Sequence, residues 1–239
     1  MFWARFKQSK PNAKAFLVCS LLVVAVLVWK FSTILLFANV GHLQGSRPCP
    51  RLNEKIDTEL VARVGFDVSR ILTELGVDHA LCYESLLAAL KYGRMLSRQD
   101  HIDLCIMNTH KAKVSSGLAE TLSQDGLNMQ YDLWRGEFSI SETSRPSRPL
   151  VVITVFYKTF RGKVCRAGIS RWIRSFFNSD SLDAFPQNLL EGPLNNMTFE
   201  DKRMPVPKED SKMLIFLYPN TWWLDHDPLD CSDSSKQPL

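Results

Sequence analysis

Several sequence features that mark common enzyme classes are missing from this chain of 239 residues. It has only 11 glycines, and none of them belongs to a glycine-rich phosphate-binding loop. None of its 6 cysteines stands in a Cys-x-x-C pair or in a Cys/His set with zinc spacing. Internal repeats and low-complexity segments are also absent. These absences exclude P-loop nucleotide-binding domains, zinc-finger-like domains and repeat proteins.

Acidic residues are absent from the first part of the chain, where basic residues are common. Residues 1–40 contain 5 of the 29 lysines and arginines and none of the 25 acidic residues. The remaining chain therefore has 24 basic and 25 acidic residues, a net charge of −1 (24 − 25). A nucleic-acid-binding domain concentrates positive charge on its fold, so we expect no nucleic-acid partner.

A long apolar run follows the basic N-terminal residues. It extends from Ala15 to Trp29 without a charge, and after Lys30 it continues to Phe37. These 23 residues are enough to cross a bilayer. Four basic residues and no acidic residue precede the run, so the positive-inside rule places the N-terminus in the cytosol and the rest in the secretory lumen. A cleaved signal peptide is the alternative, but no small-residue cleavage site follows closely.

The sequence after the apolar run predicts one α/β domain behind a short stem. The expected segments are a basic tail at 1–14, a signal-anchor at 15–37, a stem at 38–55, the domain at 56–224 and a polar tail at 225–239. Apolar periodicity predicts helices at 57–75, 85–90, 111–122 and 171–177, and strands at 77–83, 127–134, 138–140 and 150–157. This order, alternating helices and strands followed by a run of strands, is typical of one α/β domain.

An acidic motif follows the short helix expected at 85–90. Gly93 ends that helix, and Asp100-His101-Ile102-Asp103 leads into an apolar strand that continues at Leu104. Carboxylates beside a buried strand are costly to desolvate unless a cation meets them. A divalent metal that carries a phosphate is one such partner. The simpler alternative is that both carboxylates lie in a loop and face water.

The acidic segment resembles the core motif of the LicD/fukutin family, which includes fukutin and fukutin-related protein. The family pattern is close to G-T-L-L-G-A-x-R-H-G-x-x-x-P-W-D-D-D-I-D-I. Here residues 84–89 stand at G-T-L-L-G-A, 91–93 at R-H-G and 99–104 at D-D-D-I-D-I. A second match, Met204-Pro205-Val206-Pro207 followed by Leu214 and Tyr218-Pro219, resembles the family's V-x-V-P…L…Y-G-x-x-W ending.

The resemblance implies a nucleotidyltransferase-like fold, which is a mixed sheet flanked by helices with the acidic strand near its centre. It also implies the transfer of a phosphorylated sugar alcohol, or a similar group, from a CDP-activated donor to a glycan. It implies Mg²⁺ or Mn²⁺ on the donor diphosphate, with Asp103, Asp100 and His101 as metal ligands and catalytic residues. It also places Ser85 and Lys91 near the donor. A helix N-cap role for Ser85 and a solvent-exposed position for Lys91 are the alternatives.

The chain departs from the family pattern at the residues that carry the chemistry. Gln99 and His101 stand where the family has acids, and Thr154 stands at a further acid on a later strand. Asp103 is therefore the only clearly retained metal carboxylate, and histidine is a poor ligand for Mg²⁺. Two functions stay open. One is a transferase with a rearranged site, and the other is a catalytically silent relative that binds a glycan, a nucleotide or another glycosylation enzyme.

The sequon and the cysteines bear on the compartment. Asn196 opens Asn-Met-Thr, the only N-glycosylation sequon of the chain. We expect Cys82 and Cys105 to be buried strand cysteines, and we favour a disulfide between Cys49 and Cys231 in an oxidising compartment. The length of the apolar run is compatible with the Golgi or the endoplasmic reticulum membrane.

A basic patch, Arg161, Lys163 and Arg166, follows the strongest predicted strand. It would either receive an anionic donor or simply face solvent.

Overall fold

A computed structural model describes residues 57–96, 99–159, 162–169, 184–218 and 222, together with positions 21, 22, 24, 26 and 29. The chain divides into two compact units, Met1–Cys49 and Pro50–Leu239. Among the described residues, no helix combines the length and the apolar character that a membrane crossing requires. Most of the expected signal-anchor at 15–37, and all of the predicted tail and stem at 1–14 and 38–55, lie outside the described residues.

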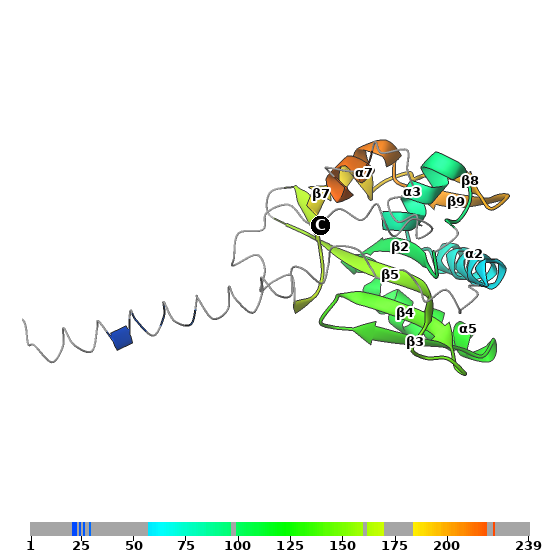
Figure 1. Cartoon of the computed structure of the whole chain (residues 1–239), viewed down its shortest axis with the longest axis horizontal. Coiled ribbons are helices and arrows are strands. Elements are labelled where there is room, and N and C mark those ends of the chain that lie inside the picture. Colours follow the sequence, from blue (N-terminus) through cyan, green and yellow to red (C-terminus); the bar gives the residue numbers. More distant parts are fainter. Residues whose placement is uncertain are drawn as a thin grey trace, which may run out of the picture. The chain divides into compact units, whose positions relative to one another are not determined.

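The second unit combines helices and strands (Figure 1). The helices are α2 (Thr58–Glu74), α3 (Tyr83–Tyr92), α4 (Lys111–Lys113), α5 (Ala119–Gln124) and α7 (Asp210–Leu217). The strands are β1 (His79–Leu81), β2 (Ile102–Met107), β3 (Leu127–Asp132), β4 (Glu137–Glu142), β5 (Pro149–Lys158), β6 (Lys163–Arg166), β7 (Ala184–Pro186), β8 (Asn195–Phe199) and β9 (Lys202–Val206).

Seven of these strands form one mixed sheet. Its order is β1-β2-β5-β4-β3, with β6 paired to β5 and β7 paired to β6. Strands β2 and β5 run parallel, and the other neighbours in this sheet run antiparallel. Strands β8 and β9 form a separate hairpin. The structure thus confirms the predicted mixed sheet flanked by helices.

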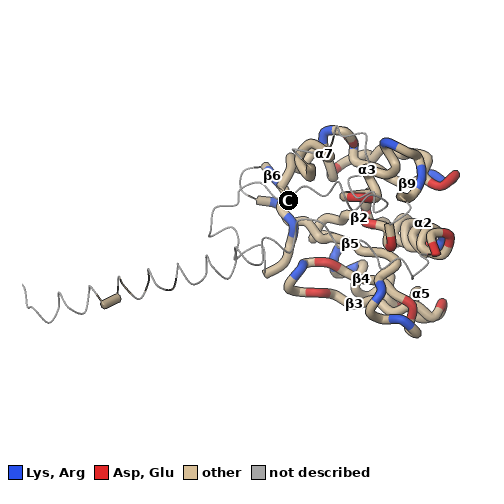
Figure 2. Tube along the Cα trace, in the orientation of Figure 1, with Lys and Arg blue, Asp and Glu red and all other residues tan. Residues whose placement is uncertain are grey.

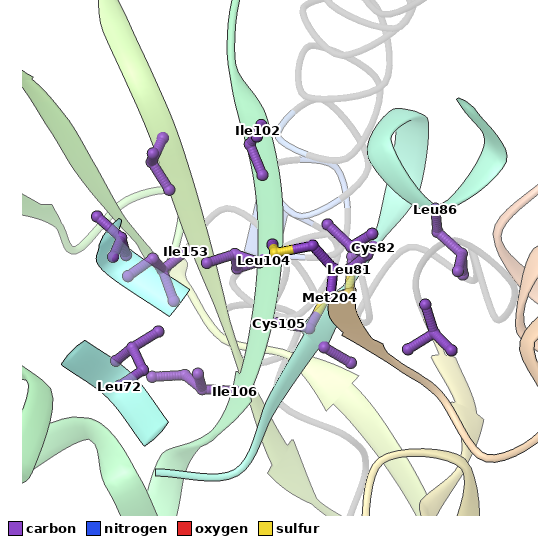
Figure 3. Close-up of a cluster of buried hydrophobic side chains, with 14 of the residues drawn as sticks. Leu72, Leu81, Cys82, Leu86, Ile102, Leu104, Cys105, Ile106, Ile153 and Met204 are labelled. Atoms are coloured by element: carbon purple, nitrogen blue, oxygen red, sulfur yellow. A yellow bond between two sulfur atoms is a disulfide. The ribbon is translucent and has the colours of Figure 1, made fainter. Parts of the chain in front are cut away.

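The two faces of the sheet differ because side chains alternate along each strand. On one face, Ile102, Leu104 and Ile106 of β2 line up with apolar residues of β5, and Leu104 pairs with Ile153. Helix α2 packs against this face, and Figure 3 shows Leu72 of α2 beside Ile106. The opposite face carries the alternate residues of β2, among them Asp103, and α3 packs there.

Several local predictions match the structure. Helix α2 begins where the side chain of Asp57 accepts a hydrogen bond from the Leu60 amide at 3.0 Å, which is an N-cap. Strands β3, β4 and β5 confirm the strands expected at 127–134, 138–140 and 150–157. The strand expected at 77–83 is shorter because Tyr83 already begins α3. The helix expected at 171–177 lies outside the described residues.

Every core residue that the structure describes belongs to the Pro50–Leu239 unit, from Val61 to Leu217. This unit thus contains the described hydrophobic core, and we expect it to fold alone. One polar group within it is His79, whose Nδ1 donates to the Val77 carbonyl at 2.9 Å and whose Nε2 lies 2.7 Å from the Ser69 hydroxyl. Burial lowers the pKa of His79, so its neutral form is favoured in the fold.

Candidate functional site

The start of α3 is fastened to the acidic strand β2. The Cys82 amide donates to the Asp103 carbonyl at 3.0 Å, and the Asp103 amide donates to the Ser85 hydroxyl at 2.7 Å. A disulfide joins Cys82 to Cys105 across a Cα–Cα distance of 5.8 Å, and both cysteines lie in the buried cluster of Figure 3. Both cysteines are buried, as predicted, and the structure adds the disulfide between them, which the sequence did not predict.

The disulfide favoured from the sequence falls on residues that the structure does not describe. Cys49 and Cys231, the pair favoured from the sequence, lie outside the described residues. Cys165 on β6 is the one free cysteine that the described part of the chain contains.

Ser85 lies inside the first turn of α3 and is not its N-cap. The helix begins at Tyr83, and Cys82 occupies the N-cap position, so the predicted capping role is wrong. The Ser85 hydroxyl is fully buried and accepts hydrogen bonds from Gln99 Nε2 at 2.6 Å and from the Asp103 amide at 2.7 Å. These contacts make Ser85 an internal link between α3 and β2.

Gln99 occupies its position with a side chain that donates as well as accepts. Its Nε2 donates to Ser85 and also to the His101 carbonyl at 3.0 Å, while its Oε1 accepts from the Leu96 amide at 3.3 Å. A carboxylate accepts hydrogen bonds only, so an acid here would lose both donated bonds. The buried hydrogen-bond network that Gln99 completes therefore explains a neutral amide at position 99.

The three residues predicted to hold a metal contact one another directly. His101 Nδ1 lies 2.5 Å from Asp100 Oδ1, and His101 Nε2 lies 3.2 Å from Asp103 Oδ1. His101 and Asp103 are buried, whereas the Asp100 side chain is 42% exposed. An imidazole that carries hydrogen on both nitrogens donates to both carboxylates. The order is thus a partly exposed carboxylate, a buried imidazole and a buried carboxylate.

This order does not fit a divalent metal held by all three residues. The two carboxylates face opposite ring nitrogens, so the imidazole stands between them. A metal ligand must present an unprotonated nitrogen or oxygen at about 2.0–2.2 Å from the ion. His101 satisfies this only after it gives up one of its carboxylate contacts. Over the described ranges, no group of three His, Cys, Asp or Glu residues is placed to hold a metal.

Lys91 and Thr154 lie on two elements next to β2, and the role predicted for Lys91 stays a prediction. Lys91 lies in the last turn of α3, six residues beyond Ser85, which corresponds to about 9 Å along a helix. Thr154 is buried on β5 and pairs with Cys105, so it lies on the same sheet face as Asp103. Its hydroxyl cannot supply the negative charge that the family has at this position.

The structure places a partly buried ion pair on the same sheet face, which local sequence patterns did not predict. Glu137 of β4 lies directly opposite Thr154, and Arg166 of β6 lies opposite Phe156. The Arg166 guanidinium binds the Glu137 carboxylate, and Arg135 Nη1 approaches the other carboxylate oxygen at 3.5 Å. The alternation of Glu137 and Ser139 with Phe138 and Ile140 assigns Glu137 to the polar face, but its partner on β6 depends on strand pairing.

The residues of the predicted basic patch therefore have different surroundings. Arg166 faces inward and neutralises Glu137, whereas Lys163 is exposed and Arg161 lies outside the described residues. Arg166 is therefore not simply a solvated residue, since its guanidinium is partly buried and paired with Glu137.

The sequon is accessible in the structure. Asn196 and Thr198 are both exposed on β8, in the hairpin that β8 forms with β9. Glycosylation at Asn196 stays a prediction, and the geometry of the hairpin is compatible with it.

Comparison with known proteins adds little to this description. No family model matches the chain, and no curated protein matches it. A solved structure of the lincosamide antibiotic adenylyltransferase LnuA with bound lincomycin is similar at a TM-score of 0.43 and 14% sequence identity. The similarity covers 74% of this chain and 97% of that one. At this level it assigns no function to the chain.

Proposed function

We propose that the Pro50–Leu239 unit is a catalytically silent relative of the LicD/fukutin family that binds a glycan in the secretory lumen. The observation that carries the proposal is that the His101 imidazole lies between the Asp100 and Asp103 carboxylates and contacts both. The family resemblance supplies the scaffold, and the contacts within the motif argue against its metal-dependent transfer chemistry. The nucleotidyltransferase-like fold that the resemblance implies is part of this proposal.

Transfer from a CDP-activated donor needs a cation on the diphosphate and a carboxylate near the acceptor hydroxyl. In this chain Asp103 is buried and already faces an imidazole nitrogen at 3.2 Å. Gln99 and Thr154, at two of the other acid positions, are neutral and buried. The residues that would assemble a metal–diphosphate complex are thus engaged with each other or uncharged.

A glycan is the favoured ligand because charges on the described polar sheet face compensate one another. Glu137 is paired with Arg166, and Arg135 lies near both Glu137 and Asp132. In Figure 2, basic and acidic segments are interspersed over the unit. A neutral, hydroxyl-rich ligand suits such a surface better than a nucleotide diphosphate, which requires excess positive charge.

We also propose single-span type II topology in the Golgi or endoplasmic reticulum membrane. The Cys82–Cys105 disulfide supports an oxidising compartment, and the exposed sequon at Asn196 is compatible with the lumen. The apolar run at 15–37 supports the anchor. Protease protection in sealed microsomes tests the topology, and digestion of a C-terminal tag from the outside would refute it.

Calorimetric titration of the Pro50–Leu239 unit with Mn²⁺ or Mg²⁺, with and without CDP, tests the loss of metal chemistry. We expect wild type and Asp103→Asn to give the same weak response. His101→Asp removes the imidazole from between the carboxylates and should gain metal affinity. Asp125→Asn is the matched control, because Asp125 is an exposed acid at the end of α5.

The second candidate function is a transferase with a rearranged site. It is favoured by one observation, that Asp100, His101 and Asp103 do lie in direct contact. CDP-dependent Mn²⁺ binding that disappears in Asp103→Asn but persists in Asp125→Asn would establish this candidate and refute the silent module.

A further inference from the structure

A tight turn between β3 and β4 presents large apolar side chains to solvent. Leu133 is 60% exposed and Trp134 is 53% exposed, and Arg135 follows them. Ile169, which is 41% exposed, lies beside this turn because its amide donates to the Leu133 carbonyl at 3.2 Å. We call Leu133, Trp134, Arg135 and Ile169 the turn patch.

The backbone of the turn is fixed by its own hydrogen bonds. Asp132 Oδ1 accepts from the Trp134 amide at 2.8 Å and from the Arg135 amide at 3.0 Å. The Gly136 amide donates to the Asp132 carbonyl at 2.7 Å. This is the local side-chain-to-backbone geometry that Asp favours in turns. The apolar side chains are therefore displayed by an ordered turn with satisfied backbone groups.

The turn also interlocks with the segment after β6. Gly136 has φ +72°, and a Cβ there would meet the Ala167 backbone at 2.2 Å. Gly168 has φ +113°, and a Cβ there would meet the Trp134 carbonyl oxygen at 2.7 Å. Arg166 Nε donates to the Arg135 carbonyl at 3.2 Å. Two glycines and a long-range hydrogen bond thus hold the exposed side chains in place, which is the preorganisation that a binding surface needs.

The size of the turn patch decides between classes of partner. The exposed fractions of Leu133, Trp134 and Ile169 correspond to an apolar surface on the order of 300 Å². A stable protein–protein interface takes about 800 Å² from each partner. Shallow insertion into a bilayer interface needs less surface, because a tether supplies a high effective concentration. Tryptophan prefers the interface, and arginine pairs with lipid phosphates.

We propose that the turn patch inserts into the surface of the bilayer to which the chain is anchored. This inference rests on the proposed membrane anchor. Leu133, Trp134 and Ile169 enter the interfacial region, and the Arg135 side chain, which is 67% exposed, meets headgroup phosphates. The ligand is the phospholipid surface itself, and the contact orients the domain relative to the membrane.

The test uses the Pro50–Leu239 unit with an N-terminal hexahistidine tag on phosphatidylcholine vesicles that contain a nickel-chelating lipid. Brominated acyl chains in the vesicles quench the fluorescence of tryptophans that enter the bilayer. We expect quenching in wild type that is absent in Trp134→Phe. In an untethered sedimentation assay, Leu133→Ser should lower the vesicle partition coefficient about tenfold.

Ile215→Ser is the matched control for these measurements, since Ile215 is a similarly exposed apolar residue on α7. It should partition as wild type does. Equal quenching in wild type and Trp134→Phe overturns the proposal. A wild-type dimer that Leu133→Ser converts to a monomer in light scattering also overturns it, in favour of self-association. The metal titrations and the protease-protection assay do not depend on the turn patch, so failure here is distinguishable from failure of the proposed function.

Discussion

Removal of the Cys82–Cys105 disulfide should destabilise the Pro50–Leu239 unit by a calculable amount. The two cysteines are separated by 23 positions in the sequence. In the chain-entropy description, closing a loop of this length removes about 11.4 cal/mol/K from the unfolded state, which is about 3.4 kcal/mol at 25 °C. For a domain of this size that corresponds to a decrease of about 7–14 °C in Tm.

The variant Cys82→Ala/Cys105→Ala opens the bridge without leaving reactive thiols. Both cysteines are fully buried, so the small void left by the sulfurs adds to the cost. We expect the urea-unfolding free energy, followed by circular dichroism, to fall by at least the loop-closure value. Cys165→Ala is the control, since Cys165 is a free and partly exposed cysteine, and it should leave the free energy nearly unchanged.

The bridge also fastens the segments that carry the Cys82–Asp103 and Asp103–Ser85 hydrogen bonds. Hydrogen exchange at the Cys82 and Asp103 amides should therefore accelerate more than exchange at β3 and β4. A double variant as stable as wild type, together with alkylation of both cysteines in denatured protein without reductant, would refute the reasoning.

Further measurements address other buried groups and the compartment. Because burial lowers the pKa of His79, the folded protein binds fewer protons than the unfolded chain near and below pH 6.5. The unfolding free energy should therefore keep its full His79 contribution above pH 6.5 and decrease as the pH falls below this value. His79→Asn should flatten this part of a profile of urea midpoint against pH. Glu137→Gln weakens the partner of Arg166 and should cost about 1–3 kcal/mol in denaturant unfolding, and a change below 0.3 kcal/mol would contradict the ion pair. Asn196→Gln should abolish an endoglycosidase-sensitive mass shift of protein expressed in the secretory pathway, and a shift that persists would place the glycan elsewhere.

Local sequence patterns were sufficient for several elements of the fold. The apolar repeat from Leu60 to Leu72, with Asp57 before it and Gly76 after it, specifies α2 because one helix face is buried. The apolar run in β5 specifies a strand because it is buried. The alternating residue types at 127–134 predicted β3, although its residues are only partly buried or exposed. The acidic motif was also visible in the sequence, together with its departures from the family pattern.

The partners of the buried polar and sulfur groups were decided by tertiary structure alone. The antiparallel pairing of β1 with β2 brings Cys82 to Cys105, and the alignment of β4, β5 and β6 brings Glu137 to Arg166. The sequence predicted that Asp100, His101 and Asp103 act together, but the structure decided that they bind one another. Strand register joins segments far apart in the chain, and a shift of one residue reverses every side chain, so local patterns determine the elements and long-range pairing determines the site.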